Sequence, residues 1–158
     1  TRGHADGEFD RPQSIAFAPS GELLVADACN HRIQVLDSTG AYARTIGGVG
    51  REPGQFVYPS GIRPLPDGTL LVAEFGGNRV QHLDAATGEC LASWNVIEGV
   101  PPPVSAYVTD GDGVLPIAVH GNVLRIPWAV AWHDGEMYVL DSGHARVLVA
   151  PVPVRTER

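Results

Sequence analysis

Acidic and basic side chains recur at a fixed spacing along this chain and are the first candidates for chemistry. The recurring acid–arginine pairs are Asp27 and Arg32, Glu74 and Arg79, and Asp141 and Arg146. A ring of such carboxylates would suit a metal or a sugar. A carboxylate at a tight turn also accepts backbone N–H bonds, and a nearby arginine can pair with it across repeats. Because the pair recurs in every copy, we predict a structural role.

Histidine is the second candidate, as a zinc ligand. The six histidines are His4, His31, His82, His120, His133 and His144. No two of them have the short spacing of a zinc motif such as HExxH. His31 and His144 occupy the same turn in different repeats, which places them too far apart for one ion. We therefore expect turn and surface histidines and no bound metal.

Two further motifs of catalysis or metal binding are incomplete. Asp110-Gly111-Asp112-Gly113 resembles the start of a calcium loop, but the twelfth position of an EF-hand loop, a glutamate, is here Gly121. The chain has no GxSxG nucleophile elbow and no Gly-rich phosphate loop before a helix. The sequence predicts no catalytic residue and no cofactor, and it leans against an enzyme.

The elements that position these residues form a repeat. The segment GEFDRPQSIAFAPSGELLVADACNHRIQVLD, from Gly7, aligns without a gap on GQFVYPSGIRPLPDGTLLVAEFGGNRVQHLD, from Gly54. A third copy, IPWAVAWHDGEMYVLDSGHARVLV, begins at Ile126. Self-similarity at a period of about 40–50 residues is typical of β-propeller blades.

Each copy is read as four strands. In the first copy they are predicted at Ser14–Ala18, Glu22–Ala26, Arg32–Leu36 and Ala41–Ile46. The chain has 19 Gly and 13 Pro, which fall between short apolar runs as the turns of many strands do. The predicted fold class is all-β: a β-propeller of four-stranded antiparallel blades, with about three blades present.

The predicted boundaries lie within a single propeller segment, residues 1–158. They are blade 1 at about 7–48, blade 2 at about 54–95, an insertion at about 96–125 with a strand at Leu115–Val119, and blade 3 at about 126–152.

The motif VADACNHRIQVLD resembles the signature of NHL repeats, here with Asn30-His31-Arg32 at the turn. The second copy keeps GGNRVQHLD and the third keeps DSGHARVLV. The resemblance implies a partial propeller of about six blades. An open arc leaves apolar faces without neighbours, so we expect further blades in the same parent chain or self-association of half-propellers.

The loops at one end of the blades are the predicted binding face. Its candidate residues are Arg11, Asn30, His31, Arg51, Gln55, Tyr58, Asn78, Arg125, Trp128 and His144. Tyr, Trp and Arg are the residues that most often anchor interfaces. For Tyr58 and Trp128, packing between blades is the competing interpretation.

Function is less constrained than fold. We favour a non-catalytic scaffold that binds a protein or other ligand through this face. One alternative is a propeller enzyme, a metal-dependent lyase or lactonase completed by further blades. The resemblance to peptide-amidating lyases implies zinc-binding histidines at Ser14, Gly61 and Ala129, which this chain lacks.

RNA binding is the second alternative. The formal net charge is −7, and no cluster of Lys and Arg is present, so a nucleic-acid partner is not favoured. No apolar run is long enough to span a bilayer.

Overall fold

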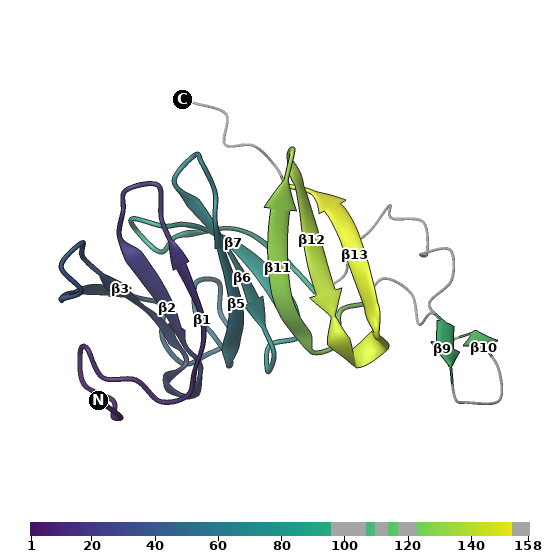
Figure 1. Cartoon of the computed structure of the whole chain (residues 1–158), viewed down its shortest axis with the longest axis horizontal. Helices are drawn as coiled ribbons and strands as arrows, with labels where there is room; N and C mark the ends of the chain where they lie inside the picture. The colour runs from purple at the N-terminus through teal and green to yellow at the C-terminus, as the bar shows by residue number, and fades with distance from the viewer. Residues whose placement is uncertain (96–106, 110–113, 117–122, 153–158) are drawn as a thin grey trace.

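The chain folds into antiparallel β-sheets that pack side by side (Figure 1). The computed structural model describes residues 1–95, 107–109, 114–116 and 123–152. In these residues, the only helices are two short 3₁₀ turns, η1 (Ala28–Asn30) and η2 (Ser142–His144). Neither comes near the length and apolar character that a membrane-crossing helix requires.

The first blade is a four-stranded sheet in the order β1-β2-β3-β4. Its strands are β1 (Pro12–Phe17), β2 (Leu23–Asp27), β3 (Arg32–Leu36) and β4 (Tyr42–Ile46). β3 has the predicted bounds, and the other three strands differ from them by one or two residues. Each strand is antiparallel to its neighbour, as the prediction of propeller blades requires.

The second blade repeats this plan in the order β5-β6-β7-β8. Its strands are β5 (Pro59–Pro64), β6 (Thr69–Glu74), β7 (Arg79–Asp84) and β8 (Cys90–Trp94). The register is conserved between the two repeats, since Ile15 pairs with Val25 and the aligned Ile62 pairs with Val72. The gap-free alignment of the two sequences therefore corresponds to two superimposable sheets.

The third blade has three strands within the described residues, in the order β11-β12-β13. They are β11 (Pro127–His133), β12 (Glu136–Asp141) and β13 (Arg146–Pro151). Two further strands, β9 (Tyr107–Thr109) and β10 (Val114–Pro116), pair with each other in the predicted insertion. β10 overlaps the strand expected at Leu115–Val119, and residues 117–119 lie outside the described residues.

The second strand of the second blade, β6, is apolar because it is covered on both faces. All six residues of β6 are buried. Successive side chains of a strand point to opposite faces, so Leu70 and Val72 pack toward the first blade, and Leu71 and Ala73 pack toward the third. This explains the dense apolar run that the sequence shows at this strand.

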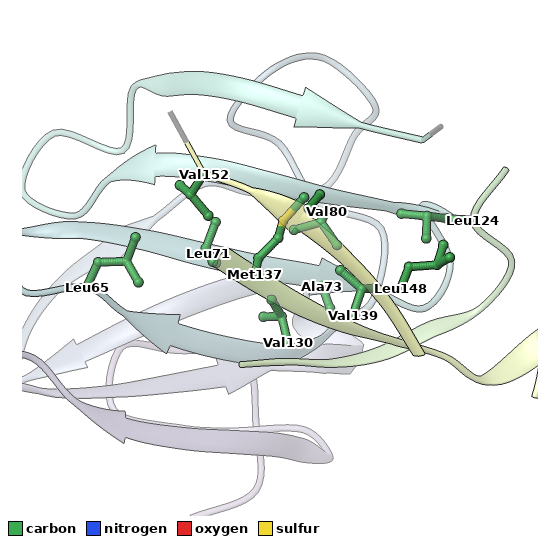
Figure 2. Close-up of a cluster of buried hydrophobic side chains, with 11 residues drawn as sticks. Leu65, Leu71, Ala73, Val80, Leu124, Val130, Met137, Val139, Leu148 and Val152 are labelled. Carbon is green, nitrogen blue, oxygen red and sulfur yellow. The ribbon is translucent and has the colours of Figure 1, made fainter. Parts of the chain in front are cut away.

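Figure 2 shows the core between the second and third blades. Leu71 and Val80 from the second blade meet Met137, Val139 and Leu148 from the third. These five side chains are fully buried. Fully burying one such side chain is worth about 1.5–3 kcal/mol, so contact between these two blades contributes several kcal/mol to the stability of the arc.

The innermost strands β1, β5 and β11 contact one another in sequence and all run in the same direction (Figure 1). Each follows a stretch without regular structure that we call its lead-in segment: residues 1–11, 47–58 and 123–126. Each second strand returns to the same end of its blade before the turn to the third strand. The lead-in segments and these turns therefore gather along one edge, the lower edge in Figure 1. We call this edge the loop face.

Candidate binding surface

Each lead-in segment is tied by its backbone to the second-to-third strand turn of its own blade. The Cys29 N–H donates to the carbonyl of Asp10 at 3.1 Å, and the Gly76 N–H donates to that of Val57 at 3.1 Å. In the third blade the Gly143 N–H donates to the carbonyl of Arg125 at 2.9 Å. The loop face is therefore built the same way in all three blades.

The recurring carboxylates are buried at these ties. Asp27, Glu74 and Asp141 are each 0% exposed. Each accepts a hydrogen bond from the arginine five residues later, with Nε-to-oxygen distances of 2.9, 2.5 and 2.7 Å. Each also accepts a backbone N–H from its lead-in segment, at 2.7, 2.8 and 2.7 Å. The carboxylates hold loop to strand and are not exposed to a ligand.

The arginines complete the tie, and each pairs with the carboxylate of its own blade. Asp27 and Arg32 are register partners on β2 and β3, so the pair closes one hairpin. The expectation of pairing across repeats was wrong, because the spacing of five residues spans only this turn. Arg79 also donates to the carbonyls of Arg51 at 2.6 Å and Gln55 at 2.7 Å. The guanidinium charge is thus neutralised inside its own blade.

Two buried glutamines belong to the same network and were not singled out from the sequence. Gln34 accepts the Gly7 N–H at 2.8 Å and donates to Asp27 at 3.1 Å. Gln81 accepts the Gly54 N–H at 2.9 Å and donates to Glu74 at 2.7 Å. The sequence signal was the Arg-x-Gln pattern shared by the first two repeats; the third repeat has Leu148 at this position.

A second set of hydrogen bonds joins successive blades. The Tyr58 N–H donates to Nδ1 of His31 at 3.0 Å, and the Ile126 N–H donates to Oδ1 of Asn78 at 2.8 Å. Donor and acceptor residues all have left-handed backbone angles, with φ between 52° and 58°. His31 and Asn78, predicted to contact a ligand, are therefore occupied in linking blades.

Asn30 and His144 share one structural position, the residue before the left-handed one. The Asn30 amide donates to Asp27 at 2.8 Å, and Nδ1 of His144 lies 2.9 Å from Asp141. His31 and His144 lie in the same turn of different blades, as expected, but at adjacent positions of that turn. Their imidazoles consequently perform different tasks, one linking blades and the other satisfying a buried carboxylate.

A row of aromatic rings crosses the junction between the second and third blades on the loop face. The ring centroids of Tyr58 and Phe75 are 5.3 Å apart, and those of Phe75 and Trp128 are 5.6 Å apart in an edge-to-face arrangement. Phe75 is 36% exposed and Trp128 is 40% exposed. We call these three residues the aromatic surface. They come from a lead-in segment, a turn and an inner strand.

Tyr58 also borders the first blade. Burial raises the pKa of the Tyr58 hydroxyl, and the neighbouring Cys29 thiol raises it further. The Arg11 guanidinium acts in the opposite direction and lowers the pKa. Arg11 itself is exposed. The aromatic surface therefore has a cationic neighbour at its first-blade end.

Phe75 was missed from the sequence. Its aligned residues are Ala28 in the first repeat and Ser142 in the third, both small. A large apolar residue in a turn where the other copies have a small one was the available signal. Such a side chain cannot fit beneath the turn as the buried Ala28 does, so it lies on the surface.

The remaining predicted binding residues do not join this row. The side-chain Oε1 of Gln55 accepts the Glu52 N–H at 3.2 Å within its own loop. Arg51 and Arg125 are exposed on the loop face. Of the predicted set, Tyr58 and Trp128 belong to the row, and Arg11 neighbours Tyr58.

The described residues contain no group of three or more His, Cys, Asp or Glu side chains placed to hold a metal ion. The predicted calcium-like segment, Asp110 to Gly113, lies outside the described residues. Cys29 and Cys90 are free thiols.

A pocket of about 370 Å³ lies between the first two blades, at the end away from the loop face. Glu22 and Arg44 form an ion pair in its wall, and Arg44 also donates to the carbonyl of Ala85 at 3.2 Å. Pro64 and Asp67 contribute from the second blade. The bond from Arg44 to Ala85 joins the two blades, so the polar groups of this pocket have a structural explanation.

Comparison with known families and structures agrees with this geometry. The family described as "NHL repeat" matches residues 9–36, which run from the lead-in segment to the end of β3. No curated protein sequence matches the chain.

Several solved structures have the same fold at low sequence identity. A Bacteroides caccae protein of unknown function has a TM-score of 0.58 at 16% identity, over 87% of this chain and 44% of that one. Hydrazine synthase from Kuenenia stuttgartiensis has a TM-score of 0.56 at 15% identity, over 92% of this chain and 37% of that one.

Virginiamycin B lyase from Staphylococcus aureus has a TM-score of 0.50 at 14% identity, over 91% of this chain and 42% of the lyase. This chain therefore spans less than half the length of each of the three structures. Such identities show a shared fold. The first blade matches the NHL-repeat family, and the repeated sheets give this chain a β-propeller-type fold, with three blades in its described residues.

Proposed function

We propose that this chain is a non-catalytic binding scaffold whose contact site is the aromatic surface. The observation that carries the proposal is the continuous row of Tyr58, Phe75 and Trp128 across a blade junction, with Phe75 and Trp128 partly open to solvent. Exposed aromatic rings that contact one another form a rigid apolar platform, and such residues are enriched among the anchors of interfaces.

The chemistry around the row narrows the kind of ligand. The buried carboxylates and arginines of the loop face are engaged with each other and with the backbone. Arg11 is the cationic group beside the row. A ligand that fits offers apolar side chains to the three rings and an acidic group toward Arg11, as a peptide segment of a protein partner can.

The test uses a phage-displayed random peptide library selected on the purified wild-type chain. We expect enriched peptides to carry aromatic or aliphatic residues and to lose about tenfold or more in affinity against Trp128→Ala or Phe75→Ala. Leu91→Ala is the matched control, because Leu91 is also an exposed large apolar residue but lies on β8, away from the row.

Retained affinity for Leu91→Ala supports the proposal. Peptides that bind all three variants equally, or a selection that enriches no binder, would argue against the aromatic surface as the contact site. Circular dichroism of each variant confirms that the blades remain folded.

A propeller enzyme is the second candidate, favoured by the fold shared with virginiamycin B lyase. The positions at which the peptide-amidating lyases place histidines are Ser14, Gly61 and Ala129 here, and all three lie on inner strands. A zinc site of that kind in this protein would need residues beyond the described ones. Metal analysis, considered in the Discussion, separates the two proposals.

A further inference from the structure

The two blade junctions in this chain are built alike. Each combines a hydrogen bond between blades with a covered apolar residue on the inner strand. At each junction, a left-handed turn residue of one blade, His31 or Asn78, accepts a backbone N–H from the lead-in segment of the next. Next to this bond, an inner-strand apolar residue is covered by the preceding blade. Ile62 is 6% exposed, and the aligned Val130 is 9% exposed.

The first blade has the same parts with nothing against them. Ile15, aligned with Ile62, is 67% exposed, and Phe17 on the same side of β1 is 73% exposed. Arg11 aligns with Tyr58 and has the same left-handed backbone, with φ of 50°. Its N–H has no acceptor among the described residues. We call Ile15, Phe17 and the Arg11 N–H the first-blade face.

The third blade offers only part of the complementary surface. Leu140 and Val147 are exposed, while their aligned residues Ala73 and Val80 in the second blade are fully buried by the third. The turn residue that should accept the next N–H is Ala145, with φ of 50°. Its methyl group cannot accept a hydrogen bond.

We propose that the first-blade face docks a further antiparallel blade whose turn carries a hydrogen-bond acceptor, such as Asn or His, at its left-handed position. The apolar part of the face requires a covering sheet, since the aligned residues at both occupied junctions are buried by one. The docked blade must also supply an acceptor for the Arg11 N–H, because at both occupied junctions a side chain accepts the corresponding N–H.

This requirement discriminates against the third blade of a second copy. Two copies joined end to end would bring Ala145 to Arg11 and leave that N–H without a side-chain partner. An unsatisfied donor at a covered site costs binding free energy. The occupant that fits is therefore a blade of the same kind that is not this chain's third blade, and this chain spans less than half the length of each of the solved structures of this fold.

The experiment converts the third blade into the proposed partner. Ala145→Asn supplies the acceptor, and Asn tolerates a left-handed backbone. Ala145→Gly is the matched control, because it also relaxes that backbone but supplies no acceptor. Sedimentation equilibrium gives the self-association constant of each variant and of the wild type. We expect Ala145→Asn to associate about threefold to tenfold more tightly than both, the effect of one net hydrogen bond.

Two further measurements locate the effect. Adding Ile15→Glu to Ala145→Asn should abolish the gain, because a carboxylate would be buried on the first-blade face. Amide hydrogen exchange followed by NMR should show that the Arg11 N–H exchanges freely in the wild type and is protected in Ala145→Asn at associating concentrations. Tyr58 and Ile126 amides should be protected in both.

The outcomes decide the proposal. It is supported by a gain that Ala145→Gly lacks, that Ile15→Glu removes and that protects the Arg11 amide. It is overturned if Ala145→Asn associates no more tightly than Ala145→Gly, or if the wild type associates as tightly as Ala145→Asn. A gain that survives Ile15→Glu, or that leaves the Arg11 amide unprotected, overturns it as well.

Discussion

Nδ1 of His31 in the first blade accepts the backbone N–H of Tyr58 in the second at a distance of 3.0 Å. The acceptor role fixes the ring proton on Nε2, so the imidazole serves here as a neutral side-chain acceptor. In the next junction an amide oxygen, that of Asn78, has the same role. An imidazole and an amide are thus interchangeable at this position of the repeat.

This equivalence predicts that His31→Asn unfolds within about 0.5 kcal/mol of the wild type in urea titrations. His31→Gly retains the left-handed backbone without an acceptor, and we expect it to be about 1 kcal/mol or more less stable. Equal stability of the two variants would show that the bond between blades contributes nothing measurable.

The buried carboxylate of Glu74 accepts from Val57, Arg79 and Gln81. Glu74→Gln removes the charge that neutralises Arg79 and places an amide donor among three donors. We expect a loss of about 3–5 kcal/mol in the free energy of unfolding, the usual cost of breaking a buried ion pair. The control is Glu89→Gln, an exposed glutamate in the turn before β8, which should change stability by less than about 0.5 kcal/mol. A small effect at Glu74 would mean that this tie is not a principal support of the blade.

Stability should depend on pH through His82, which is buried on β7 with Nε2 2.7 Å from the Thr69 hydroxyl. Burial lowers the pKa of His82, and the charge of Asp67 opposes this only in part. Between the ordinary histidine pKa of about 6.5 and the lower folded value, the unfolded chain binds more protons. The stabilising contribution is therefore complete above about pH 6.5 and is lost as the pH falls through the folded-state pKa.

The measurement is the urea midpoint from pH 5 to pH 8, compared with that of His82→Gln. The variant cannot titrate at this site, so the difference between the two proteins should shrink as the pH falls. Parallel curves would assign the pH dependence to other groups.

Elemental analysis of protein purified without chelators should find zinc and calcium well below one ion per chain. The buried carboxylates Asp27, Glu74 and Asp141 are already paired with arginines, and the described residues hold no ligand cluster. A ratio near one ion per chain would favour the propeller enzyme over the scaffold.

Single-stranded RNA should bind no more tightly than expected for non-specific contacts at physiological salt. The formal net charge of −7 opposes the accumulation of phosphates, and affinity of this kind falls steeply with salt. Filter binding with sequences of mixed composition measures this. Selective binding that persists at physiological salt would contradict the scaffold proposal.

Periodic features of the fold were accessible from the sequence, whereas specific side-chain contacts were not. The gap-free alignment of the first two repeats predicted the strands because a shared register requires equal spacing, as Ile15 and Ile62 show. The His31–Tyr58 bond was not predictable, since it requires left-handed backbones at both residues. Those conformations are uncommon for residues other than glycine and follow from the packing of neighbouring blades.

The aromatic surface was likewise only partly predictable from the sequence. Tyr58 and Trp128 were recognised by residue type and by their place before or at the start of inner strands. Phe75 lies in the same turn as Asn78, but it is not one of the residue types, Tyr, Trp and Arg, on which the prediction of interface anchors rests. Its contact with both other rings depends on how far one blade is rotated from the next, and strand patterns in one sequence do not contain that angle.

The network around the lead-in segments also fixes where one blade can be separated from the next. Gly48 accepts the Phe56 N–H at 2.7 Å, as Thr1 accepts the Phe9 N–H at 3.0 Å. A gene duplication with its breakpoint between Gly47 and Gly48 therefore copies a blade together with the residues that bond to its lead-in segment. A breakpoint at Gly54, where the sequence repeat becomes visible, separates Phe56 from these residues. Propellers lengthened or shortened by recombination should therefore join between Gly47 and Gly48. This point lies close to the predicted end of blade 1 and well before Gly54, where the second copy becomes visible in the sequence.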